Sequence, residues 1–492
     1  MKKVLLCAAA ITSIAGAARA DELADLKSMS DQLQQQNKAL MQRIDQLEQR
    51  ETRLEAQPVP AAAQPTSGGA PFPADDGTLT WHGMTLYGGI DLGAAYQSHG
   101  TPLNPNYGPG LEYLISKNSN KGLVSLAPNA LSYSNIGLKG SEEVLPGLSA
   151  VFNVQATFNP TSGDLSNGPQ ALASNNGVAL NKQTSNADSS HAGQIFDSAA
   201  YVGLSSATYG TLTVGRQNSL TLDGVINYDP NGASNAFSLI GYSGTTAGTG
   251  DTEDARLDNS VKYLVNVGPV RAGGLVQFGQ SDNISSRGAY EFDLGTDYQG
   301  LSVDAIYSQV YDAIAAAAIA APTPAQTNEL AGTISDNTSE MLLARYDFGP
   351  AKIYAGWEHI QFDNPSNPLT APTGTIGGFN LGTVSNTAFT ENKILNIYWT
   401  GAKYAITPQF TITGAWYHET QNSFNKDNGC SNTSNAACSG DEDAFSLVAD
   451  YQFTKRFDVY AGAMYSMVQG GLESGFLSSN TVDPTVGARF RF

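Results

Sequence analysis

Cysteine, long apolar runs and charged residues are all scarce in this sequence. The 492 residues include three Cys, and charged residues make up 14% of the chain. Beyond the N-terminal leader, no run approaches the roughly 18 apolar residues that a membrane helix needs, which excludes a helical anchor. The few Cys and His are not spaced as metal ligands, so we expect no metal site and no cofactor.

Basic residues are scarce as well, with 26 Lys and Arg against 45 Asp and Glu. Without Lys2, Lys3 and Arg19, which lie in the leader, 23 basic residues remain and the net charge is −22. Nucleic acid is therefore excluded as a partner, because binding to phosphates needs clustered Lys and Arg. Cations, or anionic lipids bridged by divalent ions, suit this charge better.

The first twenty residues have the pattern of an export signal. Lys2 and Lys3 form a basic start, an apolar stretch runs from Val4 to Ala18, and the small residues around Arg19 form a cleavage site. We therefore predict a signal peptide over 1–20 and an exported mature chain.

Cys430 and Cys438 are the Cys residues that lie outside the leader, in the polar stretch 425–441. An exported protein can oxidise such a pair. We predict one short disulfide that pins the tip of an external loop and need not carry chemistry.

Residues 21–57 form a separate segment with a seven-residue repeat. With the repeated Leu at heptad position d, the a positions include polar residues, among them Asn37, which would fix the register at a cost in stability. Five heptads predict a self-associating periplasmic coiled coil about 50 Å long, with a solvated amphipathic helix as the alternative. The repeated positions are Leu26, Leu33, Leu40, Leu47 and Leu54. A Pro/Ala/Gly linker follows over 58–80.

From residue 81 to residue 492 apolar and polar residues alternate. We count sixteen such segments, uncertain by two, joined in turn by short turns and long polar loops. Long loops are expected near 98–130, 160–196, 218–255, 313–338, 363–391 and 421–442. The segment from Val486 to Phe492 alternates to its aromatic end, as a strand that closes a barrel does. Together with the export signal, this favours an all-β, 16-stranded antiparallel transmembrane β-barrel over a soluble sandwich, with apolar faces toward lipid and polar faces toward a lumen.

Five blocks of this region occur in a specific order. They are Leu86–Gly93, Ile136–Glu142, Pro146–Ala150, the pair Ala200–Leu204 and Tyr209–Gln217, and Arg256–Tyr263. With Phe492, these blocks resemble the trimeric general-diffusion porins of Gram-negative outer membranes over roughly residues 82–492. The coiled coil and linker lie outside that family's usual pattern.

The resemblance implies a homotrimer whose third external loop, here 218–255, folds into each lumen. In the family, wall arginines face the acids of this loop across a constriction. Arg216 and Arg256 match those positions, whereas Asn135 stands where another Arg is frequent. The acids expected at the constriction are Asp223, Asp229, Asp251, Glu253 and Asp254.

Alternation supports part of this assignment. Arg256 and Lys262 share the polar face of their segment, and Asn135 and Lys139 share the polar face of theirs, so all four are expected at the lumen wall. Arg216 has the parity of apolar neighbours, so simple alternation points it outward unless a bulge at Gly215 turns it.

These features predict an outer-membrane channel for passive diffusion of small hydrophilic solutes and ions, weakly cation-selective because acids dominate the loop. Expected partners are outer-membrane lipid and lipopolysaccharide, with contact of the coiled coil to peptidoglycan left open. A substrate-specific channel and a cell-wall tether are the alternatives. An enzyme is not expected, since the five His have no nucleophile motif beside them.

Overall fold

A computed structural model describes Gln35, Lys38 and residues 79–108, 113–240, 256–279, 288–371, 373–424, 430 and 435–492. The chain divides into two units, Met1–Pro73 and Ala74–Phe492. Gln35 and Lys38 are helical. The rest of the predicted signal peptide and coiled coil, and nearly all of the linker, lie outside the described residues, so these assignments stay predictions. All described residues other than Gln35 and Lys38 belong to the second unit.

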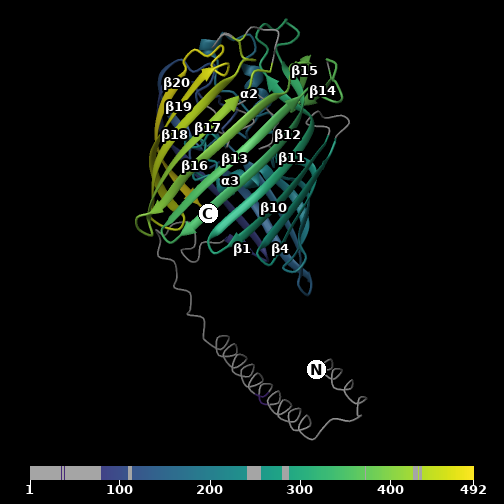
Figure 1. Cartoon of the computed structure of the whole chain (residues 1–492), viewed down its shortest axis with the longest axis vertical. Coiled ribbons are helices and arrows are strands. Elements are labelled where there is room, and N and C mark those ends of the chain that lie inside the picture. Colours follow the sequence, from purple (N-terminus) through teal and green to yellow (C-terminus); the bar gives the residue numbers. More distant parts are fainter. Residues whose placement is uncertain are drawn as a thin grey trace, which may run out of the picture. The chain divides into compact units, whose positions relative to one another are not determined.

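The second unit is a closed β-barrel of sixteen antiparallel strands, which confirms the predicted fold class. β3 and β4 together form one interrupted strand, and β1, β14 and β15 are additional to the sixteen. Figure 1 shows the strands running obliquely side by side, with α2 near the upper loops. The strands are β1 (Leu79–Trp81), β2 (Met84–Gly100), β3 (Lys121–Pro128), β4 (Asn135–Leu145), β5 (Leu148–Thr157), β6 (Ala199–Ser206), β7 (Gly210–Asn218), β8 (Arg256–Val267), β9 (Val270–Phe278), β10 (Gly288–Tyr298), β11 (Leu301–Ala317), β12 (Glu329–Phe348), β13 (Ala351–Asp363), β14 (Thr373–Ile376), β15 (Phe379–Ser385), β16 (Lys393–Ala405), β17 (Phe410–Gln421), β18 (Gly440–Gln452), β19 (Phe457–Gly470) and β20 (Asn480–Arg491).

Short helices lie in two of the connections between strands. The external connection between β5 and β6 contains α2 (Gly168–Ser174) and the 3-10 helix η2 (Leu180–Lys182). The connection between β7 and β8 contains α3 (Leu220–Tyr228). None of the helices in the described part of the chain is long and apolar enough to cross a membrane.

The last strand closes the barrel against the first. β20 pairs with β2 from Gly89 opposite Arg491 to Ala95 opposite Thr485. Phe492 extends this pairing, since its backbone N–H donates to the Gly88 carbonyl and its carbonyl accepts the reciprocal bond, each 3.0 Å long. The alternating C-terminal segment is thus used to its end.

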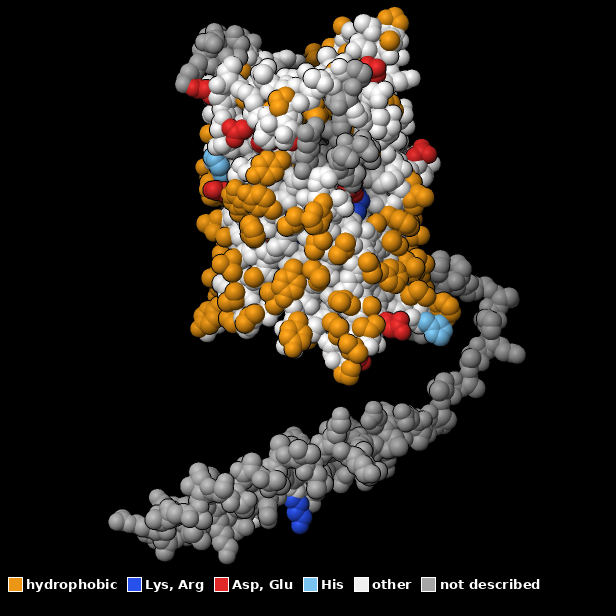
Figure 2. Space-filling view, turned by 90° about the vertical axis from the view of Figure 1, so that its right-hand side faces the viewer, with side chains coloured by type: hydrophobic (Ala, Val, Ile, Leu, Met, Phe, Trp, Pro, Cys, Tyr) orange, Lys and Arg blue, Asp and Glu red, His pale blue; other side chains and the backbone are white. Residues whose placement is uncertain are grey.

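The outer face is apolar, as the alternation predicted. Large hydrophobic side chains are exposed along the strands, and Figure 2 shows them covering the lower part of one face of the barrel beneath a largely polar top. Aromatic side chains gather at two levels, one toward the loops and one toward the short turns, as at the two interfaces of a membrane. The first level includes Trp357, Tyr398, Trp416 and Phe445, and the second includes Tyr346, Phe348, Tyr404, Tyr451 and Phe453.

The inner face differs from the prediction of a uniformly polar lumen. Inward positions on β11 to β16 include buried Ile306, Leu343 and Ile397, which belong to the main buried apolar cluster. The same cluster contains residues of the external connections, such as Leu172 and Leu239. Because loops fold onto this wall, apolar side chains there are covered by other protein atoms rather than by water.

Three of the predicted long loops contain strand structure. The region 98–130 includes β3, the region 363–391 includes β14 and β15, and β11 and β12 extend well into 313–338. β15 pairs in parallel with the first residues of β12. The loops in these regions are therefore shorter than the sequence predicted.

Candidate channel lumen and constriction

The connection after β7 folds against the inside of the barrel. Ser219 caps α3 by accepting a bond from the Leu222 N–H at 3.0 Å, and the Leu220 N–H donates to the carboxylate of Glu291 on β10. The helix contacts β9, β10, β11, β12 and β13. The described part of this connection, residues 219–240, is called the inner loop below.

Arginines of the wall hold the last turn of α3. Arg271 on β9 donates to the Tyr228 hydroxyl at 2.9 Å and to Asp304 on β11 at 2.8 Å. Arg345 on β12 donates to the Asn227 carbonyl at 3.3 Å, and its guanidinium lies 5.9 Å from the centre of the Tyr228 ring. On β16, the Trp399 indole N–H also donates to this turn, to the Tyr228 carbonyl at 3.0 Å.

Asp229, which directly follows α3, connects several parts of the inner loop and the barrel wall through its carboxylate. Its side chain is 3% exposed and accepts bonds from the Tyr417 hydroxyl at 2.7 Å, the Ala233 N–H at 2.7 Å and the Asn231 N–H at 3.2 Å. Burial raises the pKa of this loop carboxyl, and these hydrogen bonds offset only part of the rise. The carboxylate is therefore engaged by protein donors, where the sequence had placed it at a water-filled constriction.

The inner loop continues to the opposite wall. The Asn231 amide donates to Ser446 on β18 at 2.9 Å, and the rings of Phe237 and Tyr460 on β19 lie 6.2 Å apart. The Asn235 amide donates to the Asn129 carbonyl, between β3 and β4, at 2.7 Å. Residues 219–240 thus link β7 to walls on the far side of the barrel and narrow its interior.

The remaining predicted loop acids divide into two groups. The Asp223 carboxylate forms an ion pair with Lys262 on β8, whose ammonium also donates to the Asn218 carbonyl at 3.0 Å. This predicted acid and this predicted wall cation are therefore in direct contact. The other three, Asp251, Glu253 and Asp254, lie outside the described residues.

Arg216 does not follow simple alternation. The ladder between β7 and β8 shifts between Gly215 and Gln217, and Gly215 has a φ of +132°, where a Cβ would lie 2.2 Å from a backbone oxygen. Arg216 is 7% exposed, and it donates to the Asp197 carbonyl at 2.6 Å and to the Asp258 carboxylate at 2.8 Å. The bulge at Gly215 is the irregularity that the sequence suggested.

Arg256 joins the same polar cluster at the loop ends of β7 and β8. Its guanidinium lies 5.8 Å from the centre of the Tyr133 ring, and its Nη1 is 3.4 Å from His191 Nε2. His191 Nδ1 is 2.8 Å from the Asp197 carboxylate. Burial alone would raise the pKa of Asp197, but the hydrogen bond and charge of His191, the hydrogen bond from the Thr157 N–H and the charge of Arg256 together hold that pKa below its ordinary value.

The two predicted wall residues of β4 lie on its inner face. Lys139 is exposed, and its ammonium lies 5.1 Å from the centre of the inward Tyr87 ring. The Asn135 amide donates to the Tyr133 carbonyl at 2.7 Å, so it lies beside the ring that Arg256 faces.

Sequence reasoning missed the role of the connection between β5 and β6, residues 158–198, called the cross loop below. Its Asn176 accepts a bond from the Ile319 N–H at 2.6 Å and donates to the Glu329 carbonyl at 2.7 Å. The cross loop, which begins after β5, therefore reaches β12. Its His191 and Asp197 contact Arg256 and Arg216. Arg271 and Arg345 were also missed, although each stands among alternating residues that could have marked it as inward.

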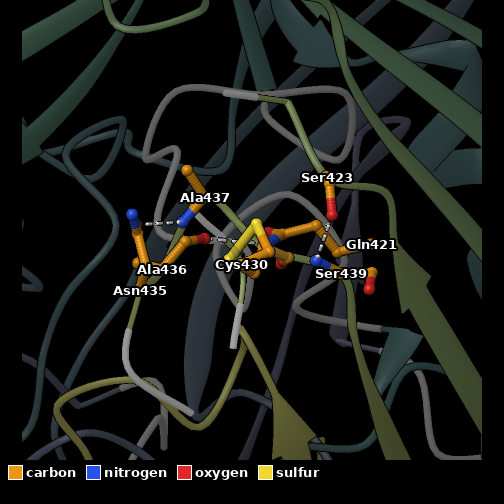
Figure 3. The surroundings of a disulfide bond; sticks show 8 residues. Gln421, Ser423, Cys430, Asn435, Ala436, Ala437 and Ser439 are labelled. Carbon is orange, nitrogen blue, oxygen red and sulfur yellow. Dashed lines mark hydrogen bonds between the residues drawn. A yellow bond between two sulfur atoms is a disulfide. The ribbon is translucent and has the colours of Figure 1, made fainter. Parts of the chain in front are cut away.

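Cys430 and Cys438 are joined by a disulfide in the structure. Figure 3 shows its surroundings: the Gln421 amide donates to the Ala436 carbonyl at 2.9 Å, and the Ser439 N–H donates to the Ser423 hydroxyl at 2.9 Å. The bond lies in the external connection between β17 and β18, where the polar stretch had placed it.

A closed barrel with an apolar outer face and an inward-folded loop defines a membrane channel of the porin class. Comparison with known proteins agrees, since the sequence profile of the Gram-negative porins matches residues 52–471. The chain belongs to the Gram-negative porin family. It is therefore an outer-membrane porin.

Individual relatives are distant. An outer membrane porin protein of Bordetella pertussis is 25% identical over 423 residues, covering 83% of this chain and 94% of the relative. The solved anion-selective porin of Comamonas acidovorans has a TM-score of 0.56 and 17% identity, covering 83% of this chain and 99% of that one. OmpT of Vibrio cholerae, in its trimer form, has a TM-score of 0.50 and 14% identity over 83% of this chain and 99% of that one.

Proposed function

We propose that the chain forms a homotrimeric, water-filled channel in the outer membrane for passive diffusion of small hydrophilic solutes and ions, with weak cation selectivity. The attachment of the inner loop across the barrel carries this proposal, because it narrows the interior of the barrel. The trimer form of the similar OmpT barrel supports the assembly.

Charge supports the cation preference. The whole chain carries 45 acidic against 26 basic residues. Fixed negative charge along a narrow aqueous path concentrates cations, and salt weakens the effect by screening. Arg216, Arg256, Lys139 and Lys262 with Asn135 form the proposed wall opposite the loop acids, including Asp251, Glu253 and Asp254.

The test is the reversal potential of purified trimers across a planar bilayer in a KCl gradient. We expect a modest potential of the sign that favours K⁺, smaller at high salt. A clear preference for Cl⁻, in the manner of the anion-selective porin of Comamonas acidovorans, would contradict the proposed selectivity while leaving the channel assignment intact.

A diffusion channel rather than an enzyme suits the chemistry of the described side chains. His191 is hydrogen-bonded to Asp197, but its other ring nitrogen faces Arg256 and not a hydroxyl or thiol nucleophile. We therefore assign the pair a role in holding the wall.

The segment 21–57 is proposed to lie in the periplasm as a coiled coil that reinforces the trimer or contacts peptidoglycan. Contacts of the barrel with outer-membrane lipid and lipopolysaccharide are proposed on the apolar outer face. Deleting residues 21–57 and measuring trimer heat stability and peptidoglycan pull-down separately distinguishes the two roles of the segment.

A further inference from the structure

Carboxylates gather on the inner face of the barrel toward its external end. Glu419 on β17 lies directly opposite Glu442 on β18. On the other side of Glu419, Ile397 of β16 and then Glu358 of β13 continue the same row. Residues directly opposite on one face of an antiparallel pair have Cβ atoms about 5 Å apart, and like charges there are destabilising.

Two of these carboxylates are buried and have oxygens without a hydrogen-bond partner. Glu419 is 0% exposed, and neither of its carboxylate oxygens has a hydrogen-bond partner; Glu442 is 3% exposed, and its Oε1 has none. Glu358, by contrast, accepts a bond from the Ser339 hydroxyl at 2.9 Å. Buried polar groups of native proteins are nearly always paired, so the Glu419–Glu442 pair is incomplete as a purely protein site.

The local charge indicates what completes it. Lys393 lies within electrostatic range of Glu419, and Lys117, a residue of the connection between β2 and β3, lies within range of Lys393. Deprotonation of the three Glu of this row beside one Lys would leave a net charge of −2, which one bound divalent cation would neutralise. Oxygen ligands of this kind select hard ions such as Ca²⁺ and Mg²⁺.

We propose that the carboxylates of Glu419 and Glu442 bind one hard divalent cation, Ca²⁺ or Mg²⁺, at the external end of the lumen wall. The described residues contain no preformed group of three metal-ligating side chains. The site is therefore a two-carboxylate site whose other ligands are water or backbone oxygens, a mode that hard divalent ions use.

The described residues next to Cys438 lie close to this pair. Gln421, the next inward residue of β17 after Glu419, holds the Ala436 and Cys438 carbonyls at 2.9 and 2.8 Å (Figure 3). Gly440 stands opposite Gln421, as Glu442 stands opposite Glu419. A bound ion thus ties β17 to β18 beneath the external loop and stabilises that end of the barrel.

The test uses full-length trimers refolded without lipopolysaccharide, so that no lipid supplies calcium sites. Titration calorimetry with CaCl₂, with bound calcium measured after dialysis, is expected to give one ion per chain. E419Q/E442Q is expected to weaken binding roughly tenfold or more, because affinity follows the number of charged ligands. E340Q, the same change at an exposed position of β12, is the matched control and is expected to bind normally.

Absent binding in the wild type, or equal binding in E419Q/E442Q, overturns the proposal and indicates a shared proton instead. A second readout covers the case in which the double variant does not fold. The wild-type trimer is expected to melt at a lower temperature in EDTA than in CaCl₂, and equal melting temperatures would overturn the proposal as well.

Discussion

The inner loop and the cross loop both fold into the interior of this barrel, and they are held there by different chemistry. Around the buried Asp229, the inner loop is attached through neutral donors and apolar packing. The cross loop is attached near Asp197 through charged side chains: Arg216 donates to the Asp197 carbonyl, and Arg256 lies beside His191, which contacts the Asp197 carboxylate. The carboxyl of Asp229 is therefore held by neutral groups and that of Asp197 lies among charged ones, so acid, salt and substitution should affect the two attachments differently.

The two aspartates show the difference most clearly. The pKa of Asp229 is raised by burial, whereas that of Asp197 is lowered because its interactions with His191, Thr157 and Arg256 together exceed the effect of burial. A carboxyl whose pKa is raised on folding stabilises the folded state less as the pH rises. A carboxyl whose pKa is lowered on folding stabilises it less as the pH falls.

The largest effect is expected from D229A. The substitution leaves the Tyr417 hydroxyl and two backbone N–H groups without their acceptor, at a cost of about 3 kcal/mol or more. The inner loop should detach from β17, giving a larger single-channel conductance and more current noise.

Y417F is the matched control for D229A, because it removes one of these bonds and should cost about 1 kcal/mol. If D229A trimers conduct as the wild type does, Asp229 does not hold the inner loop in place.

R216A should have the next largest effect. It removes a buried guanidinium that donates to the Asp197 carbonyl and to the Asp258 carboxylate, whose side chain is 38% exposed, and the loss of these charged hydrogen bonds costs about 2 kcal/mol. We expect the reversal potential to shift toward K⁺ and the trimer to melt at a lower temperature. R216K, which retains charge but not the forked geometry, should keep the potential while losing stability; an unchanged potential in R216A would remove this residue from the selectivity wall.

Sequence alone predicted the barrel because alternation repeats over the whole body of the chain and the closing strand is itself alternating. It suggested that a bulge could turn Arg216 inward, but simple alternation pointed this side chain outward. The shift in the ladder at Gly215 depends on how β7 pairs with β8, which alternation within β7 alone does not show. It missed Ile306, Leu343 and Ile397 as inner-wall residues, because what covers them comes from loops distant in sequence. It also missed Arg271, whose partners are brought together only by the folding of α3.

Acidification should loosen the cross loop before the inner loop. The ionised Asp197 contributes fully above the ordinary carboxyl pKa of about 4, and its contribution is lost as pH falls through its lower folded pKa. Asp229 has the opposite shift, so acid does not remove its contribution. Pepsin digestion of trimers near pH 3 is expected to cut within 158–198 first, and the pH dependence should be absent in D197N. If pepsin cuts within 219–240 first, the inner loop and not the cross loop is the one that acid loosens.

The smallest effect is expected from D223N. The side chain of Asp223 is about one third exposed in its ion pair with Lys262, and such pairs contribute about 0–1 kcal/mol. The reversal potential should move slightly toward Cl⁻ and the melting temperature should stay unchanged. A large change in either quantity would show that this pair, and not Asp229, holds the inner loop.

Conductance of the purified protein in a planar bilayer tests the central claim, that loop 219–240 narrows a hydrated interior. The account predicts stepwise, roughly ohmic currents, and larger steps for D229A than for the wild type. A wild-type protein that inserts as trimers yet passes no ions would contradict it.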